Sequence, residues 1–203
     1  LPHTLAGTVI TDLGSTKDVL VKSLSPLAHE AGCIFIGSHP LCGSEKRGPE
    51  ACKEDLYQDR VVVVTPTDST ETDALDALGA FWAFLDTEVI VMSPREHDQL
   101  LARTSHLPHL MASLLVGAVA REGTRGLVKD LSSTGFAKTT CLADGSPDMW
   151  HDIVKSNAAP VRQELIALKL EVEKLISDIE QNDFEAVRNY LEQTMLQRRE
   201  ILD

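Results

Sequence analysis

A histidine and a glutamate lie in residues 37–48, Gly-Ser-His-Pro-Leu-Cys-Gly-Ser-Glu-Lys-Arg-Gly, between two apolar segments. An imidazole and a carboxylate in one loop, here His39 and Glu45, can act as acid and base toward a bound ligand. Pro40 restricts the backbone of the histidine before it. A solvated turn would use similar residues, so this loop alone leaves both interpretations open.

A second group of polar residues is Thr-Asp-Leu-Gly-Ser-Thr-Lys, residues 11–17, which follows a short β-branched segment. Open parallel sheets bind ligands where a strand ends and a helix begins. The first N–H groups of that helix would suit a phosphate or a carboxylate. Ordinary capping of the helix by Ser15 or Thr16 accounts for the same residues, and this alternative also stays open.

Three histidines, His97, His106 and His109, lie close together in the sequence. A metal site would need three or four donors in a defined geometry, and the nearby carboxylates have no characteristic spacing. We therefore expect no metal. A histidine packed in the core is the commonest alternative, and a substrate-binding histidine is the next.

Strand and helix signals alternate over the first 93 residues, which hold the first two groups. Alternation of this kind predicts an α/β domain with a largely parallel sheet. The expected strands are residues 7–11, 33–36, 60–65 and 88–92, and residues 37–48 are expected to form a loop. The expected helices run from Ser15 or Thr16 to Glu30 and from Asp68 or Ser69 to Leu85, the second with Leu75, Leu78, Phe81 and Trp82 facing the core.

Only helix signals remain after Ser93. Helices are expected to start after Ser93-Pro94 and again near Thr104 and Pro108, and the second is apolar nearly all round, as in a central buried helix. Further helical segments are residues 126–142 and 147–157. After Pro160 an apolar seam needs a partner helix, either in an antiparallel hairpin or in a dimer. Its residues are Val161, Leu165, Leu168, Val172, Leu175 and Ile179, and Asn182-Asp183 separates them from a last helix.

The composition excludes several classes of protein. The chain has 203 residues, of which 43% are apolar, and this content suffices for a folded core. Acidic residues outnumber basic ones by 31 to 19, and the net charge of −12 disfavours nucleic acid and anionic membranes as partners. The longest apolar stretch, residues 110–120, is shorter than the roughly 20 residues that span a bilayer. The cysteines show no C-x-x-C pair and indicate reduced thiols in a cytoplasmic protein; they are Cys33, Cys42, Cys52 and Cys141.

Four motifs together resemble the prephenate and arogenate dehydrogenases of tyrosine biosynthesis. They are residues 11–17, residues 38–48, His-Asp…Thr-Ser-His-Leu-Pro-His over 97–109, and Gly-Phe…Pro-Asp-Met-Trp-His-Asp-Ile over 135–153. The resemblance implies part of a Rossmann-type nucleotide-binding domain in residues 1–93 and an all-helical substrate-binding and dimerisation domain in residues 94–203. It also implies an oxidative decarboxylation that uses NAD or NADP, carried out by a homodimer.

The resemblance also implies roles for single residues. His39 matches the catalytic histidine, which accepts the hydrogen of the ring hydroxyl and must be neutral to do so. Ser15 matches the serine that orients this histidine and the hydroxyl. The cofactor would lie against Thr11, Gly14 and Ser15. The substrate would be bound by Ser44, Glu45, His109 and Trp150, the last of these reaching the site from the partner subunit.

Two departures from the family pattern bear on activity. No G-x-G-x-x-G turn precedes residue 11, so we expect roughly the first 80 residues of the nucleotide-binding fold to be absent, and we favour a fragment over a gene product that has lost them. Cys141 stands where members carry an arginine that binds a substrate carboxylate, and Lys138 stands where they carry an aspartate. On a helix the two share a face, so Lys138 is expected to supply the missing charge.

Two other functions remain open on the sequence. A catalytically silent helical dimerisation module would explain the absent glycine turn and Cys141. A dehydrogenase of small 3-hydroxy acids would share the sheet and the helical domain but would not need the Ser-His-Pro and Ser-His-Leu-Pro-His segments. Neither prephenate and arogenate nor NAD and NADP can be separated from these residues.

Overall fold

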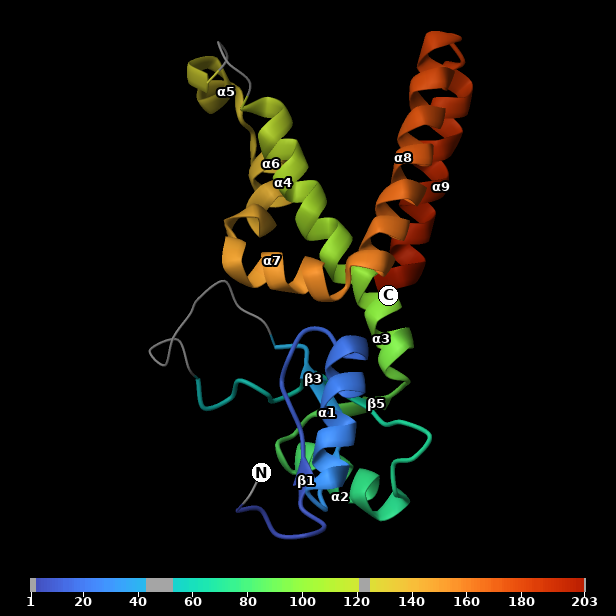
Figure 1. Cartoon of the computed structure of the whole chain (residues 1–203). Coiled ribbons are helices and arrows are strands. Elements are labelled where there is room, and N and C mark those ends of the chain that lie inside the picture. Colours follow the sequence, from blue (N-terminus) through green and yellow to red (C-terminus); the bar gives the residue numbers. More distant parts are fainter. Residues whose placement is uncertain (1–2, 43–52, 121–124, 203) are drawn as a thin grey trace. The chain divides into compact units, whose positions relative to one another are not determined.

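The computed structural model describes residues 3–42, 53–120 and 125–202 (Figure 1). Contacts within the chain divide it into two compact units, residues 1–161 and 162–203. The first unit contains the sheet and most of the helices, and the second is formed by two long helices. The expected boundary after residue 93 stays a prediction.

The described residues of the first unit contain five short strands. β1 (Val9–Ile10) pairs in parallel with β2 (Ile34–Phe35). β3 (Gly37–Pro40), β4 (Val61–Thr65) and β5 (Glu88–Val91) form a second sheet in this order. β4 and β5 are parallel, whereas β3 is antiparallel to β4. The predicted parallel pairing is therefore confirmed, except at β3.

The prediction of a loop from residue 37 onward was wrong for residues 37–40. Gly-Ser-His-Pro carries no β-branched residue, but main-chain pairing with β4 holds it as a strand, with His39 opposite Val63. A Cβ on Gly37 would lie 2.5 Å from Thr65 Oγ1 and 3.0 Å from Val21 Cγ2, so only glycine fits where β3 begins. The result is that His39 is fixed on a strand.

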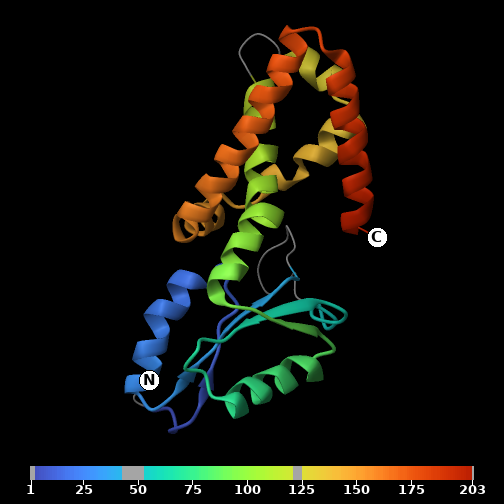
Figure 2. The same ribbon diagram turned by 90° about the vertical axis from the view of Figure 1, so that its right-hand side faces the viewer.

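Two helices cover the opposite faces of the strands, as Figure 2 shows. α1 (Asp18–Glu30) packs on the face that contains Phe35, and α2 (Thr72–Phe84) packs on the face that contains Val62 and Val64. α2 begins three residues later than the last expected cap because residues 67–70 form a turn, in which Thr70 N–H donates to Thr67 O. The expected inward position of Phe81 was also wrong: its side chain is exposed, while the neighbouring Trp82 is buried.

The first helix after the sheet continues without the expected restart. α3 (Pro94–Leu101) begins with a capping box between Ser93 and Glu96. A π-helical turn (Ala102–His106) then leads into α4 (Leu107–Val119). Pro108 has no N–H to donate, and the wider π turn before it lets the helix continue where a new N-terminus was predicted.

The apolar helix after Pro108 was expected to be buried, but in the single chain it is partly exposed, so this expectation was wrong. α4 exposes Leu114, Leu115 and Val116. The predicted helical segment 126–142 is divided at Ser132 and Ser133 into α5 (Arg125–Leu131) and α6 (Thr134–Thr140). A 3₁₀ turn (Cys141–Asp144) and α7 (Pro147–Ser156) complete this region.

The second unit contains most of α8 (Ala158–Glu180) and all of α9 (Phe184–Leu202). The predicted break is confirmed, since Asn182 has a left-handed φ of 56° and the Asp183 carboxylate accepts from Ala186 N–H at 3.0 Å. Figure 2 shows the two helices diverging from this turn. The seam residues Val172 and Ile179 are about half exposed, so the hairpin does not cover the seam. None of the helices described here is long and apolar enough to cross a membrane.

Candidate active site

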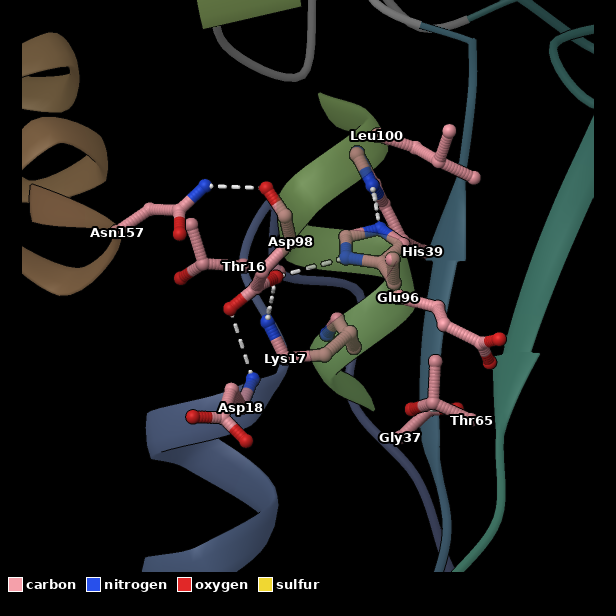
Figure 3. Close-up of polar contacts among 12 residues, drawn as sticks. Thr16, Lys17, Asp18, Gly37, His39, Thr65, Glu96, Asp98, Leu100 and Asn157 are labelled. Carbon is pink, nitrogen blue, oxygen red and sulfur yellow. Dashed lines mark hydrogen bonds and ion pairs between the residues drawn. The ribbon is translucent and has the colours of Figure 1, made fainter. Parts of the chain in front are cut away.

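A chain of hydrogen bonds links His39 on β3 to two residues of α3 (Figure 3). His39 Nδ1 lies 2.9 Å from His97 Nε2, and His97 Nδ1 lies 2.8 Å from Asp98 Oδ1. His97 and Asp98 are buried, and His39 is half-buried. The sequence placed His97 in the histidine cluster, but His97 and Asp98 were not predicted as site residues. In the sequence, only their place in the His-Asp motif pointed to a role for these two residues.

Asp98 also caps α1. Its Oδ1 accepts from Lys17 N–H at 2.8 Å, and its Oδ2 accepts from Asp18 N–H at 2.9 Å. The predicted cap by Ser15 or Thr16 was therefore wrong, since a carboxylate from a distant helix takes this position and Thr16 Oγ1 instead bonds Ser156 Oγ at 2.9 Å. Burial raises the pKa of Asp98, but the hydrogen bonds from His97 and the two N–H groups outweigh it and lower the pKa overall.

These bonds define which nitrogen of each ring carries a proton. An ionised Asp98 only accepts, so His97 donates to it from Nδ1. With a neutral His97, its Nε2 accepts from His39 Nδ1, and Nε2 of His39 is then a bare acceptor. Burial, together with nearby His97 and Lys17, lowers the pKa of His39 to about 3. The imidazole is therefore neutral at physiological pH.

An ion pair between the buried Lys17 and the partly exposed Asp12 holds the loop between β1 and α1. Asp12 Oδ2 bonds Lys17 Nζ and accepts from Gly14 N–H at 2.7 Å, while its Oδ1 accepts from Ser38 N–H at 3.2 Å. Burial lowers the pKa of Lys17, although the carboxylate of Asp12 opposes this. Asp12 thus ties the loop to β3, directly next to His39.

Two of the predicted cofactor residues make contacts within the chain. The Thr11 hydroxyl lies 2.7 Å from Ser38 Oγ, which also accepts from Trp82 Nε1 at 3.0 Å. Gly14 donates its N–H to Asp12. Within the described part of the chain, no hydrogen-bond partner of the Ser15 hydroxyl is found, and Ser15 is half-buried.

A further pair of buried polar residues supports α3. Asn157, at the end of α7, donates from Nδ2 to Asp98 O at 2.7 Å and to His106 Nδ1 at 3.1 Å. Burial lowers the pKa of His106 to about 4. Asn157 therefore connects α7 to α3, the helix that carries His97 and Asp98. Its sequence position, in a helix C-terminus, gave no signal of this contact.

The structure places His109 and Trp150 of one chain against each other. Their rings stack with centroids 3.6 Å apart at an interplanar angle of 12°. A Cβ on Gly145 would lie 2.6 Å from Trp150 Nε1, so the 3₁₀ turn before α7 packs directly on the stack. The expectation that Trp150 reaches the substrate site from a partner subunit stays a prediction; within one chain, Trp150 lies against His109.

The other predicted residues are less constrained. Lys138 and Cys141 are exposed and adjacent, with Cys141 Sγ donating to Lys138 O at 3.3 Å. Ser44 and Glu45 lie outside the described residues. The described residues contain no group of three or more histidine, cysteine or acidic side chains that could hold a metal.

Two models of one protein family match this chain, one over the sheet region and one over the helices. Residues 1–91 match the family model "Prephenate dehydrogenase, nucleotide-binding domain", and residues 93–193 match "Prephenate dehydrogenase, dimerization domain". The chain belongs to the prephenate dehydrogenase family. The fold class predicted from sequence, a Rossmann-type sheet region followed by helices, is thereby confirmed.

Curated members of the prephenate dehydrogenase family are similar along most of the chain. The prephenate dehydrogenase of Bacillus subtilis is 33% identical over 186 residues, which are 90% of this chain and 49% of the relative. The cyclohexadienyl dehydrogenase of Zymomonas mobilis is 33% identical over 177 residues, which are 86% of this chain and 60% of the relative. The chain thus spans about half the length of the curated relatives that it matches.

Solved structures of the same family superpose well. Prephenate dehydrogenase from Aquifex aeolicus, in complex with hydroxyphenyl propionate and NAD⁺, has a TM-score of 0.87 at 31% identity, and the match covers 95% of this chain and 67% of that one. Synechocystis arogenate dehydrogenase has a TM-score of 0.84 at 27% identity, with 96% and 69% covered.

Proposed function

We propose that this chain carries the base and the substrate-binding helices of an NAD(P)-dependent prephenate or arogenate dehydrogenase. With prephenate, the reaction is prephenate + NAD(P)⁺ → 4-hydroxyphenylpyruvate + CO₂ + NAD(P)H. The observation that carries the proposal is the half-buried His39 imidazole, which has a pKa of about 3 and whose Nδ1 is bonded to His97, so that Nε2 is left for a ligand.

His39 would act on the ring hydroxyl of the substrate. As the hydride leaves the ring carbon that bears this hydroxyl, the oxygen loses electron density and its hydrogen becomes a stronger donor. A hydrogen bond to His39 Nε2 therefore strengthens toward the transition state, which is the condition for lowering the barrier. Loss of CO₂ from the opposite ring carbon returns an electron pair to the ring and makes it aromatic.

The residues after β1 fit one end of a dinucleotide. Bound NAD(P)⁺ supplies the hydride acceptor of the reaction. The Ser15 hydroxyl, for which the described residues offer no partner, and the exposed backbone at Gly14 suit the nicotinamide and its ribose. The N–H groups of Lys17 and Asp18 are already bound by Asp98, so the start of α1 does not fit a pyrophosphate. These residues would therefore position the reactive end of the cofactor only.

The helical residues would bind the carboxylates and the ring of the substrate. His109, stacked on Trp150, presents an imidazole beside the 3₁₀ turn, and Ser44 and Glu45 stay predictions. Lys138 provides a single cation next to Cys141, whereas an arginine at residue 141 would bind a substrate carboxylate through two parallel hydrogen bonds. Cys141→Arg should therefore lower the KM for prephenate about tenfold, as expected of one charge-assisted contact. An unchanged KM would show that this position does not face the substrate.

We also propose that the protein works as a cytoplasmic homodimer. The apolar residues that α4 exposes, Leu114, Leu115 and Val116, support an interface at this helix, and the match of residues 93–193 to a dimerization domain supports the same assignment. Cys33, Cys42 and Cys141 are free thiols, in keeping with a reducing compartment. Sedimentation of the purified protein should give twice the mass of the chain.

The activity is tested on the protein expressed from its complete reading frame. Prephenate and arogenate are each offered with NAD⁺ and with NADP⁺, and the reduced cofactor and the released CO₂ are measured together. We expect one combination of substrate and cofactor to give equal amounts of reduced cofactor and CO₂. Dimer formation without turnover of any pair would instead identify a silent dimerisation module. Reduced cofactor without CO₂ would identify a different dehydrogenase.

A further inference from the structure

The buried pair His97 and Asp98 lies behind the histidine on which the proposed function rests. We propose that His97 and Asp98 are positioning residues, which hold His39 in the tautomer with the proton on Nδ1 and the lone pair on Nε2. This inference rests on the proposed function for its consequence in turnover, but the tautomer itself can be observed without turnover.

We call the hydrogen-bonded chain of Asp98, His97 and His39 the relay. Asp98 determines which atom donates and which accepts at each bond of the relay. Its Oδ1 receives two donors, Lys17 N–H and the ring of His97, and its Oδ2 receives Asp18 N–H. A carboxyl proton on either oxygen would face an N–H group, so the carboxylate stays ionised and accepts only. Backbone N–H groups cannot reverse their polarity. With a neutral His97, the orientation of every proton from Asp98 to His39 therefore follows from the start of α1.

The Asp98 carboxylate also fixes the start of α1 relative to His39 on β3. Through its side chain Asp98 holds the backbone at Lys17 and Asp18, two and three residues beyond Ser15. Through His97 it holds the ring of His39, and Figure 3 shows both sets of contacts converging on it. A core histidine that merely fills space would need neither the link to His39 nor the link to α1.

Several charged or titratable groups surround the relay and bear on its pH dependence. Lys17 and His106 face His39 together with His97, and all three disfavour a proton on it, whereas Asp98 favours one. Asp12 neutralises Lys17 on its other side. A pH profile of a relay variant must therefore be compared with that of the wild type at the same salt concentration, since these groups surround His39 in both.

Asp98→Asn weakens the relay at Asp98. The amide NH₂ must face the N–H of either Lys17 or Asp18, and in the orientation toward Lys17 it also faces His97. In those molecules His97 donates from Nε2, and His39 carries its proton on Nε2. In a serine protease the same kind of change lowers kcat about 10⁴-fold through the wrong tautomer. Here the amide has both orientations open to it, so we expect a smaller fall in kcat, about tenfold, with KM for prephenate changed less than about threefold.

Two substitutions of His97 separate positioning from core packing. His97→Gln places an amide oxygen near the former Nε2, where it accepts from His39, whereas the shorter His97→Asn does not reach this point. Glutamine should therefore retain at least tenfold more kcat than asparagine. Ser93→Ala is the matched control, because it removes the cap of the same helix outside the relay, and its kcat should equal that of the wild type.

The tautomer is measured by ¹⁵N NMR of the histidine rings in the purified protein. We expect His39 to carry its proton on Nδ1 in the wild type, and on Nε2 in part of the molecules of Asp98→Asn. A wild-type His39 protonated on Nε2, or equal kcat for the two His97 variants, would overturn the inference. If the expected tautomers are seen but the wild type oxidises neither prephenate nor arogenate, the positioning stands and the proposed function fails.

Discussion

The neutral state of His39 predicts a loss of stability in mild acid. Its pKa is lowered from 6.5 to about 3 by burial, and an unfolded chain regains the ordinary value. Below pH 6.5 the unfolded state binds a proton that the folded state does not, so the free energy of unfolding falls as pH falls, down to about pH 3. The slope is about 1.4 kcal/mol per pH unit, and the loss between pH 7 and pH 4.5 is about 2.5 kcal/mol.

Urea unfolding at pH 7 and at pH 4.5 measures this loss. His39→Gln removes the titrating ring, so the variant should lose about 2.5 kcal/mol less than the wild type over this range. Subtracting the two cancels the other carboxyl and imidazole groups, His106 included. His29→Gln, which replaces an exposed histidine of α1, is the matched control and should follow the wild type. Equal losses in wild type and His39→Gln would refute the assignment of a buried neutral imidazole.

Two more substitutions test the packing around the site. Gly145→Ala should destabilise the fold by roughly 1–3 kcal/mol and alter the fluorescence of Trp150, because the new methyl group would lie 2.7 Å from His109 Cε1; an unchanged urea midpoint would contradict this packing. Lys17→Met should lower the free energy of unfolding by about 3 kcal/mol, since it leaves the Asp12 carboxylate without its buried partner. A midpoint like that of the wild type would show that the ion pair is open to solvent.

Much of the sheet region could be predicted from the sequence because its signals are local. The continuous apolar segment that became β4, the capping residue Ser93 and the break at Asn182 each act through their immediate neighbours. β3 could not be predicted in this way, since Gly-Ser-His-Pro gains its strand conformation from pairing with β4. The exposure of α4 was missed for a related reason, because an apolar helix in one chain can be a surface that another chain covers.

The candidate site was predicted in part. Sequence motifs pointed to His39, Ser15 and His109, whose roles stay predictions until variants are assayed. They did not indicate that Asp98 caps α1 from 80 residues away, because a carboxylate next to a histidine in a helix has many possible partners. Asn157 was missed for the same reason. Contacts between distant segments decide which polar residues of a motif meet, and one sequence does not contain them.

The most direct test of the account is the rate of reduced-cofactor formation in a single turnover by His39→Asn. The protein is expressed from its complete reading frame, saturated with prephenate and NAD⁺, and compared with His29→Asn as the control. We predict that His39→Asn lowers the rate 10²- to 10⁴-fold, as expected from loss of a proton acceptor, while His29→Asn reacts like the wild type. A rate for His39→Asn within a factor of about three of the wild type would contradict the central role of this imidazole.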